Sequence, residues 1–263
     1  MNRLLRLSFI ALCCLPLLGG QLGGVSLTGT SMNAIADNCG HLTTFGTTED
    51  PISEGGIWLN GETDGTNWSD VAVDSTIGGG IAYGADFVDG DKARYADPVA
   101  NLKTSYITFN DDQWTEGVVY RFPGYSNPSD KHEIELLVRW EITAGNIRGY
   151  ELLWAEEGEM AIVRWEGPAG QYQTVKATLD NAIPGQAVTG DVVRFGVTGQ
   201  DPNITFSVTL NGSPVAILDG WVDASAGTRW GSGQPGIGFW PTPGSTLNKY
   251  GWSSWQACND GES

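Results

Sequence analysis

Alternating apolar and polar positions run through much of the chain and predict β-strands. The run 204–210 alternates at every step, which is the period of a strand with one buried face. Asn211-Gly212 follows it and favours a tight hairpin turn. We therefore expect 192–198, 204–210 and 214–218 to form three adjacent antiparallel strands.

A second run, 132–142, divides into two faces. Ile134, Leu136, Val138, Trp140 and Ile142 occupy one face, and Glu133, Glu135, Leu137, Arg139 and Glu141 occupy the other. We expect the first face in the core and the second in water. Further short strands are expected at 117–122, 150–155 and 159–166, and no segment has the pattern of a three-turn amphipathic helix. Short strands at this spacing predict a single antiparallel β-sandwich.

Composition and charge narrow the class of protein. The 263 residues include 37 Gly and 12 Pro, and both residue types weaken helix interiors, which argues against coiled coils and helical bundles. The formal net charge is −17. An acidic chain repels polyanions, so nucleic acid is excluded as an expected partner and acidic polysaccharides are disfavoured.

The first residues have the pattern of a secretory signal. Arg3 and Arg6 precede the apolar stretch 9–18, which is too short to span a bilayer. A small-x-small site at 34–36 would place the leader at 1–36 and the domain at 37–263, and cleavage near Gly19-Gly20 is the alternative. We expect a secreted protein, extracellular or else periplasmic or on the cell surface, without membrane insertion.

The number of cysteines in the mature chain, and their expected pairing, depend on that export. Loss of 1–36 removes Cys13 and Cys14 and leaves Cys39 and Cys258, which have a single way to pair in an oxidising compartment. A Cys39–Cys258 disulfide is therefore predicted, and two buried thiols are the alternative.

Three segments together resemble a known superfamily. Residues 190–199, then 208–212 with the Asn-Gly turn, then 233–239 with Gly233-Gln234-Pro235-Gly236 resemble the concanavalin A-like lectin and glucanase jelly rolls. The strands around 133–140 and 149–154 extend the likeness more weakly. The resemblance implies two stacked sheets with a concave face on which glycans lie, and it implies no particular reaction.

The hydrolases of this superfamily carry the pattern E-x-D-x-x-E on one strand. Glu133 matches its first position, Glu135 replaces the Asp, and Val138 stands at the third position. Because retaining cleavage needs both a nucleophile and an acid, this departure argues against a retaining hydrolase. Glu133, Glu135 and Arg139 are predicted to contact a glycan on the concave face, and a solvated face with an ion pair is the alternative.

A polysaccharide lyase on the same fold is a further alternative. The alginate lyase-like jelly rolls of this superfamily would need an R-x-E-x-R strand, a Q-x-H strand and a Tyr motif, but the strand starts with His132 and Glu133, and neither His41 nor His132 stands in a Q-x-H context. A lyase that uses His132 or Tyr120, with Arg139 neutralising the substrate carboxylate, remains open.

Tryptophan and aspartate supply the remaining candidates. Parity favours core positions for Trp140 and Trp240, whereas Trp230 lies in a Gly-rich segment and is predicted to be an exposed platform for a sugar ring. Trp68 is a weaker platform candidate. Asp86, Asp89 and Asp91 surround Gly90 and are candidates for a structural calcium site, with a solvated acidic turn as the alternative.

The leading hypothesis is a secreted, monomeric, lectin-like jelly roll that binds a neutral or weakly charged polysaccharide or glycan on its concave face. An enzyme on the same fold, a lyase before a glycoside hydrolase, is the second hypothesis. A structural or adhesive protein without a glycan site is the third, and a face that is flat or filled by a loop would favour it.

Overall fold

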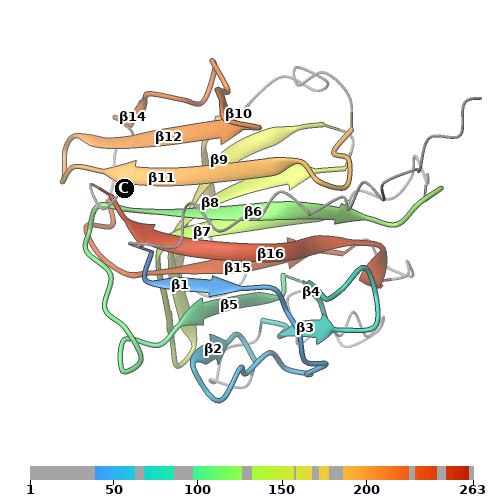
Figure 1. Cartoon of the computed structure of the whole chain (residues 1–263). Helices are drawn as coiled ribbons and strands as arrows, with labels where there is room; N and C mark the ends of the chain where they lie inside the picture. Colours follow the sequence, from blue (N-terminus) through green and yellow to red (C-terminus); the bar gives the residue numbers. More distant parts are fainter. Residues whose placement is uncertain are drawn as a thin grey trace, which may run out of the picture. The chain divides into compact units, whose positions relative to one another are not determined.

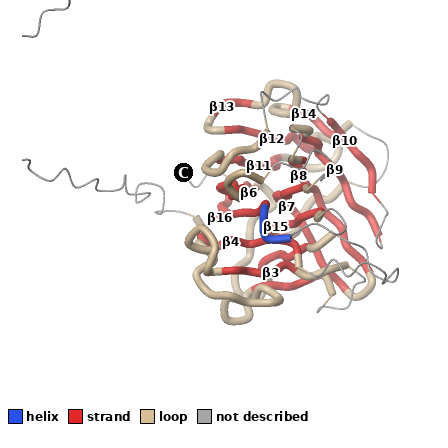
Figure 2. The backbone as a smooth tube through the Cα atoms, turned by 90° about the vertical axis from the view of Figure 1, so that its right-hand side faces the viewer, coloured by secondary structure: helices blue, strands red, loops and turns tan. Residues whose placement is uncertain are grey.

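The chain folds as a two-layered β-sandwich, seen face-on in Figure 1 and from the side in Figure 2. This computed structural model describes residues 39–62, 68–85, 97–125, 132–156, 158–167, 186–224, 229–241 and 247–260, together with the backbone of 172–177. All of them belong to one compact unit, Ile35–Ser263. Within these ranges no helix is long and apolar enough to cross a membrane.

The first layer, sheet A, has the strand order β13-β12-β11-β6-β16-β4-β3, with β1 also paired to β16 and β14 to β12. Its strands are β1 (His41–Thr43), β3 (Val71–Asp74), β4 (Ile81–Gly84), β6 (Gln113–Arg121), β11 (Val192–Thr198), β12 (Ile204–Leu210), β13 (Ser213–Pro214), β14 (Trp221–Asp223) and β16 (Tyr250–Asn259). A single 3-10 turn, η1 (Leu247–Lys249), precedes β16.

The second layer, sheet B, has the order β10-β9-β8-β7-β15-β5-β2. Its strands are β2 (Trp58–Asn60), β5 (Val99–Leu102), β7 (Glu133–Thr143), β8 (Asn146–Ala155), β9 (Met160–Gly167), β10 (Tyr172–Ala177) and β15 (Gln234–Trp240). The neighbouring strands of both sheets pair antiparallel, so the predicted antiparallel sandwich is confirmed and is consistent with a jelly roll.

The predicted hairpin at Asn211-Gly212 is also confirmed. Both residues have positive φ, 52° and 74°, as a two-residue turn of this kind requires. The return strand is shorter than the predicted 214–218, because β13 ends at Pro214 and the chain then turns until β14 pairs with the start of β12.

One apolar core lies between the sheets. It takes alternate residues from the longer strands, such as Phe195 and Phe206 of sheet A and Leu136 and Val138 of sheet B. Gly117 is required on β6, because a Cβ at this position would collide with the Trp252 ring that fills the core beside it.

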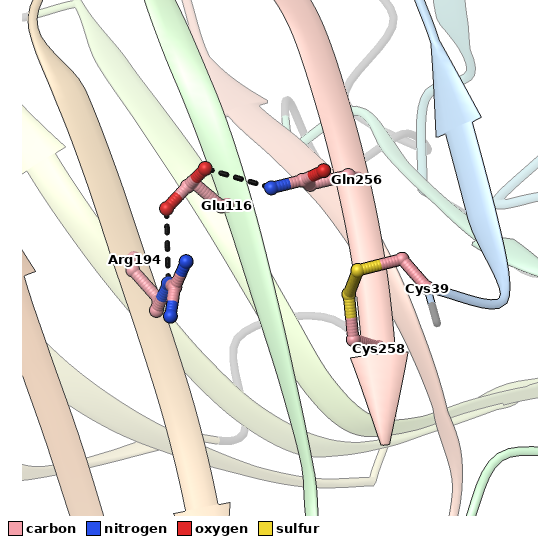
Figure 3. The surroundings of a disulfide bond; sticks show 5 residues. All are labelled: Cys39, Glu116, Arg194, Gln256 and Cys258. Atoms are coloured by element: carbon pink, nitrogen blue, oxygen red, sulfur yellow. Dashed lines mark hydrogen bonds and ion pairs between the residues drawn. A yellow bond between two sulfur atoms is a disulfide. The ribbon is translucent and has the colours of Figure 1, made fainter. Parts of the chain in front are cut away.

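The predicted disulfide is present and joins Cys39 to Cys258 (Figure 3). It fastens the start of the described chain to the end of β16, and His41 pairs with Ala257 just beyond it. The bond encloses a separation of 219 residues. Long closed loops of this kind are expected to stabilise a fold by restricting the unfolded chain.

Candidate functional site

The described residues on the outer face of sheet B, which is turned away from sheet A, include four carboxylates. Glu133 and Glu135 alternate with core residues of β7, Glu151 lies on β8, and Asp97 lies two residues before β5. Leu137 pairs with Glu151 and Leu153 pairs with Glu135. Glu135 and Glu151 are therefore diagonal neighbours on one face, close enough to interact.

Three of these carboxylates form what we call the carboxylate cluster: Glu135, Glu151 and Asp97, which are 1%, 3% and 7% exposed. Burial raises the pKa of all three. In Glu135 the charges of Glu151, Asp97 and Glu133 raise the pKa further. Like charges at this depth cannot all be ionised together. Burial and mutual repulsion therefore favour the protonated form of these carboxyls.

Glu151 is the best supported member of the cluster. Burial raises its pKa to about 7, although the indole nitrogen of Trp165 donates a hydrogen bond to Oε2 at 2.5 Å and partly lowers it. Glu135 has no such support at Oε2, which is buried without a hydrogen-bond partner. Its carboxylate lies over Gly238, where a Cβ would collide with it.

An apolar layer covers the middle of this face. We call it the outer cluster: Trp68, Val99, Leu137, Trp140, Ile142, Ile147, Ala161, Val163 and Trp165. Trp68 is fully buried and packs its ring edge-on against Trp165 at 4.7 Å and against Trp140 at 6.5 Å. Trp68 is therefore a cover and not an exposed platform. The described side chains of the face are apolar and buried at this point, an arrangement that favours the third hypothesis.

Arg139 does not lie beside Glu133 and Glu135 as parity predicts. The pairing of β7 with β8 shifts between Val138 and Glu141, and Arg139 has a φ of +49°. Such a bulge inserts an extra residue and exchanges the faces beyond it. Trp140 consequently joins the outer cluster, so its predicted burial is confirmed but its predicted face is wrong.

The bulge turns the Arg139 guanidinium into a fully buried position at the end of the sandwich. Nε donates to the Asp111 carbonyl at 2.7 Å, Nη1 to the Trp230 carbonyl at 3.0 Å and Nη2 to the Gly199 carbonyl at 2.6 Å. Nη2 also pairs with Asp112 at 3.3 Å. Arg139 therefore fastens three loops and has no surface for a ligand.

Trp230 and Trp240 exchange their predicted roles. Trp230, the expected platform, is 9% exposed and donates from Nε1 to the Trp165 carbonyl at 2.7 Å. Trp240, expected in the core, is 42% exposed and pairs with Glu133 at the end of β15. Of the four predicted glycan contacts, only Glu133 keeps a partly exposed side chain.

An open cleft of about 500 Å³ adjoins the outer cluster where β7 ends. It lies between β5, β15, the β7–β8 hairpin and the loop before β6. The polar residues that line it are Thr104, Thr108, Thr143, Ser232, Asn101, Gln234, Asp111, Glu141 and Arg148. Glu141 and Arg148 form an ion pair with each other. We call this space the amide cleft, after Asn101 and Gln234.

Three buried polar atoms of residues that line the amide cleft lack hydrogen-bond partners. They are Oδ1 of Asn101, Oε1 of Gln234 and Nε1 of Trp140. The Asn101 amide nitrogen donates to the Leu102 carbonyl at 2.9 Å, which leaves its oxygen as the unused acceptor. Buried polar groups are nearly always paired, so these three atoms mark a place where the protein supplies fewer partners than it needs.

Most of these residues could not be predicted from the sequence, because strand pairings between distant parts of the chain bring them together. Glu151 alternates with the core residues of β8 and its face is legible from parity, but the pairing that brings it to Glu135 is not. Asn101 and Gln234 lie on strands far apart in sequence that meet through Gly236. No local pattern connects them.

The lyase arrangement is not assembled. His132 precedes β7 and Arg139 lies seven residues along it, which is about 20 Å at the rise of a strand. His132 is instead buried, with Nε2 2.8 Å from the Tyr125 hydroxyl. Tyr120 lies on β6 of the other sheet.

The predicted calcium ligands Asp86, Asp89 and Asp91 lie outside the described residues. Among the residues that the structure does describe, no group of three His, Cys, Asp or Glu side chains is arranged to hold a metal ion.

Comparisons with known proteins concern the fold. No family model matches the chain, and no curated protein matches it. Similar solved structures include the potassium-bound Emp46p carbohydrate recognition domain, at 10% identity over 82% of this chain and 94% of that one, with a TM-score of 0.49. The CBM2 module of an evolved Dit protein from Lactobacillus casei BL23 phage J-1 has 11% identity over 84% and 94%, with a TM-score of 0.46. The endo-1,3-β-glucanase of Streptomyces sioyaensis has 7% identity over 83% and 95%, with a TM-score of 0.45. These likenesses describe strand arrangement alone.

Proposed function

We propose that the protein is a secreted, monomeric, non-catalytic carbohydrate-binding domain, and that the amide cleft takes the glycan. The observation that carries the proposal is the set of three unpartnered polar atoms at the cleft, on Asn101, Gln234 and Trp140. Two of them accept and one donates a hydrogen bond. A sugar ring with neighbouring hydroxyls offers both donors and acceptors at short spacing, so it supplies these partners when the Asn101 and Gln234 side chains, which are buried without a ligand, turn toward the cleft.

We prefer carbohydrate binding to catalysis as the function because the carboxylates of sheet B are enclosed. Glycoside hydrolysis uses two carboxylates that face each other across the substrate, whereas Glu135 and Glu151 are enclosed under the outer cluster. We prefer carbohydrate binding to a purely structural role because the amide cleft is open at the end of the covered face. The Cys39–Cys258 disulfide is compatible with secretion.

The proposal is tested with Gln234→Met, which removes the amide but keeps the length of the side chain. The same change at Gln256, on the outer face of sheet A (Figure 3), is the matched control. Wild type and both variants are screened on an array of neutral polysaccharides, and hits are titrated by calorimetry. We expect Gln234→Met to weaken binding about fivefold to tenfold, since a neutral hydrogen bond is lost, while Gln256→Met binds like wild type.

Melting temperatures separate binding from folding in this experiment. Because Oε1 of Gln234 has no partner in the protein, Gln234→Met should melt at or above the wild-type temperature. Equal affinity of wild type and Gln234→Met would overturn the cleft as the site. Failure of wild type to bind any saccharide, both on the neutral array and among the probes of the next subsection, would overturn the function.

A further inference from the structure

The charges at the amide cleft point to a narrower class of ligand. Three charged residues line it: Asp111, Glu141 and Arg148. Arg148 is ion-paired with Glu141 and its guanidinium lies 5.1 Å over the Trp230 ring. The charge of Arg148 is therefore balanced by that of Glu141, and the net charge of the lining is that of the Asp111 carboxylate.

Asp111 is held in place by hydrogen bonds and forms no direct ion pair with another described residue. Its carbonyl accepts from Nε of Arg139, and Oδ2 accepts from the Gln200 amide at 2.8 Å. The Arg139 guanidinium pairs instead with Asp112. The Asp111 side chain is exposed and lines the cleft, so its carboxylate is accessible to a ligand there.

The unpartnered atoms of the lining also favour a ligand that donates hydrogen bonds. Asn101 Oδ1 and Gln234 Oε1 are acceptors, and Trp140 Nε1 is the one unpartnered donor among the described lining residues. An acceptor-rich, negatively charged site fits a ligand rich in donors that carries positive charge. An ammonium group offers three donors and no acceptor. The whole chain, at −17, attracts cations and repels anions at long range.

We propose that the amide cleft selects glycans with free amino sugars over their N-acetylated counterparts and over uronate-bearing glycans, with Asp111 as the residue that determines this preference. The inference rests on the proposed function, since it assigns the ligand class of the same cleft. The ammonium group lies toward Asp111, and the neighbouring hydroxyls supply the amides of Asn101 and Gln234.

The test compares three probes on the same protein: a glucosamine oligosaccharide, its fully N-acetylated form and an oligosaccharide of glucuronate and glucose of equal length. Titrations are run at low and high salt. We expect the glucosamine oligosaccharide to bind about fivefold more tightly than the N-acetylated form, as one exposed charge pair allows. The preference should shrink as salt screens the charge.

The matched variants are Asp111→Asn and Asp74→Asn. Asp111→Asn keeps an oxygen that can accept from Gln200 and leaves the Arg139 contact to the main chain intact. Asp74 lies at the end of β3 in sheet A and changes the net charge by the same amount away from the cleft. We expect Asp111→Asn to remove the preference for the amino sugar and Asp74→Asn to preserve it.

The outcomes separate the two proposals. Equal binding of the glucosamine and N-acetylated probes, or a preference that survives Asp111→Asn, would overturn the amino-sugar inference and leave the cleft as a neutral glycan site. Absence of binding to all three probes, together with no hits on the neutral array, would overturn the proposed function itself.

Discussion

Polar atoms without hydrogen-bond partners occur at both ends of the outer face of sheet B, but they are enclosed at one end and lie beside an open cleft at the other. At one end the carboxylate cluster is enclosed beneath the outer cluster, and Glu135 Oε2 has no hydrogen-bond partner. At the other end the unpartnered atoms of Asn101, Gln234 and Trp140 adjoin an open cleft. An enclosed carboxylate can relieve its burial only by taking up a proton. An amide beside an open cleft can gain a partner from a ligand.

The carboxylate end of the face should therefore cause pH dependence, and the cleft end should bind the ligand. The carboxylate cluster should respond to protons and affect stability. The amide cleft should respond to saccharides and leave stability almost unchanged. Arg139 is the residue that holds the loops at the cleft end in place, so its loss tests whether the two ends fold as one unit.

The largest expected effect is that of Arg139→Met. The change leaves the carbonyls of Asp111, Gly199 and Trp230 without their donor and Asp112 without its cation. Leaving a buried carbonyl without its donor costs about 1 to 3 kcal/mol, so we expect the three together to lower the unfolding free energy by about 3 to 5 kcal/mol. Urea denaturation followed by tryptophan fluorescence measures this loss.

The control for this prediction is Arg194→Met. Arg194 pairs with Glu116 on the outer face of sheet A, where its side chain is 36% exposed (Figure 3). It should cost less than about 1 kcal/mol, as exposed pairs do. Similar losses in the two variants would contradict the assignment of Arg139 as the buried fastening of the cleft loops.

The next effect is a fall in stability as pH rises. Burial raises the pKa of Glu151 from the ordinary value of 4.5 to about 7, so the folded state holds a proton that the unfolded state has lost. Between these two values the unfolding free energy therefore decreases with increasing pH. The pKa values of Glu135 and Asp97 are raised in the same direction. Urea titrations from pH 5 to pH 8 should show the decrease.

Glu151→Gln tests the origin of that fall. A neutral amide cannot ionise, so the variant should lose part of the pH dependence and be more stable than wild type at pH 8. Glu166→Gln, at an exposed position on β9, is the control and should keep the wild-type slope. The lowered pKa values of Glu54 and Asp74 act at more acidic pH and do not oppose this window. A wild-type stability that rises from pH 5 to pH 8 would sink the interpretation.

Much of the fold could be predicted because it depends on local alternation. The period-2 runs that became β7, β11 and β12, the Asn211-Gly212 turn and the Cys39–Cys258 pair are all legible from neighbouring residues or from simple counting. The faces of β7 are legible only up to Val138. Beyond it the bulge at Arg139 depends on the loops that this side chain fastens, and these contacts are distant in sequence.

The candidate site could be predicted less well for the same physical reason. Parity put Glu133 and Glu135 on one face correctly, but it could not show that Trp68 covers that face or that Glu135 is buried. The reversal of Trp230 and Trp240 has a similar cause. A Gly-rich segment indicates a turn, but whether its tryptophan packs inward depends on partners such as the Trp165 carbonyl.

The smallest expected effect is that of Trp240→Ala, which tests which end of the face binds glycan. Trp240 is 42% exposed beside Glu133, at the carboxylate end of the face, and an exposed aromatic is the usual place to expect sugar stacking. If only the amide cleft binds glycan, Trp240→Ala should change the dissociation constant by less than about twofold, as a surface change away from a site does. Calorimetry with the best saccharide, run in parallel on Trp240→Ala and Gln234→Met, measures both ends. A larger loss in Trp240→Ala than in Gln234→Met would move the binding site to the carboxylate end, since the two residues lie at opposite ends of the same strand, β15.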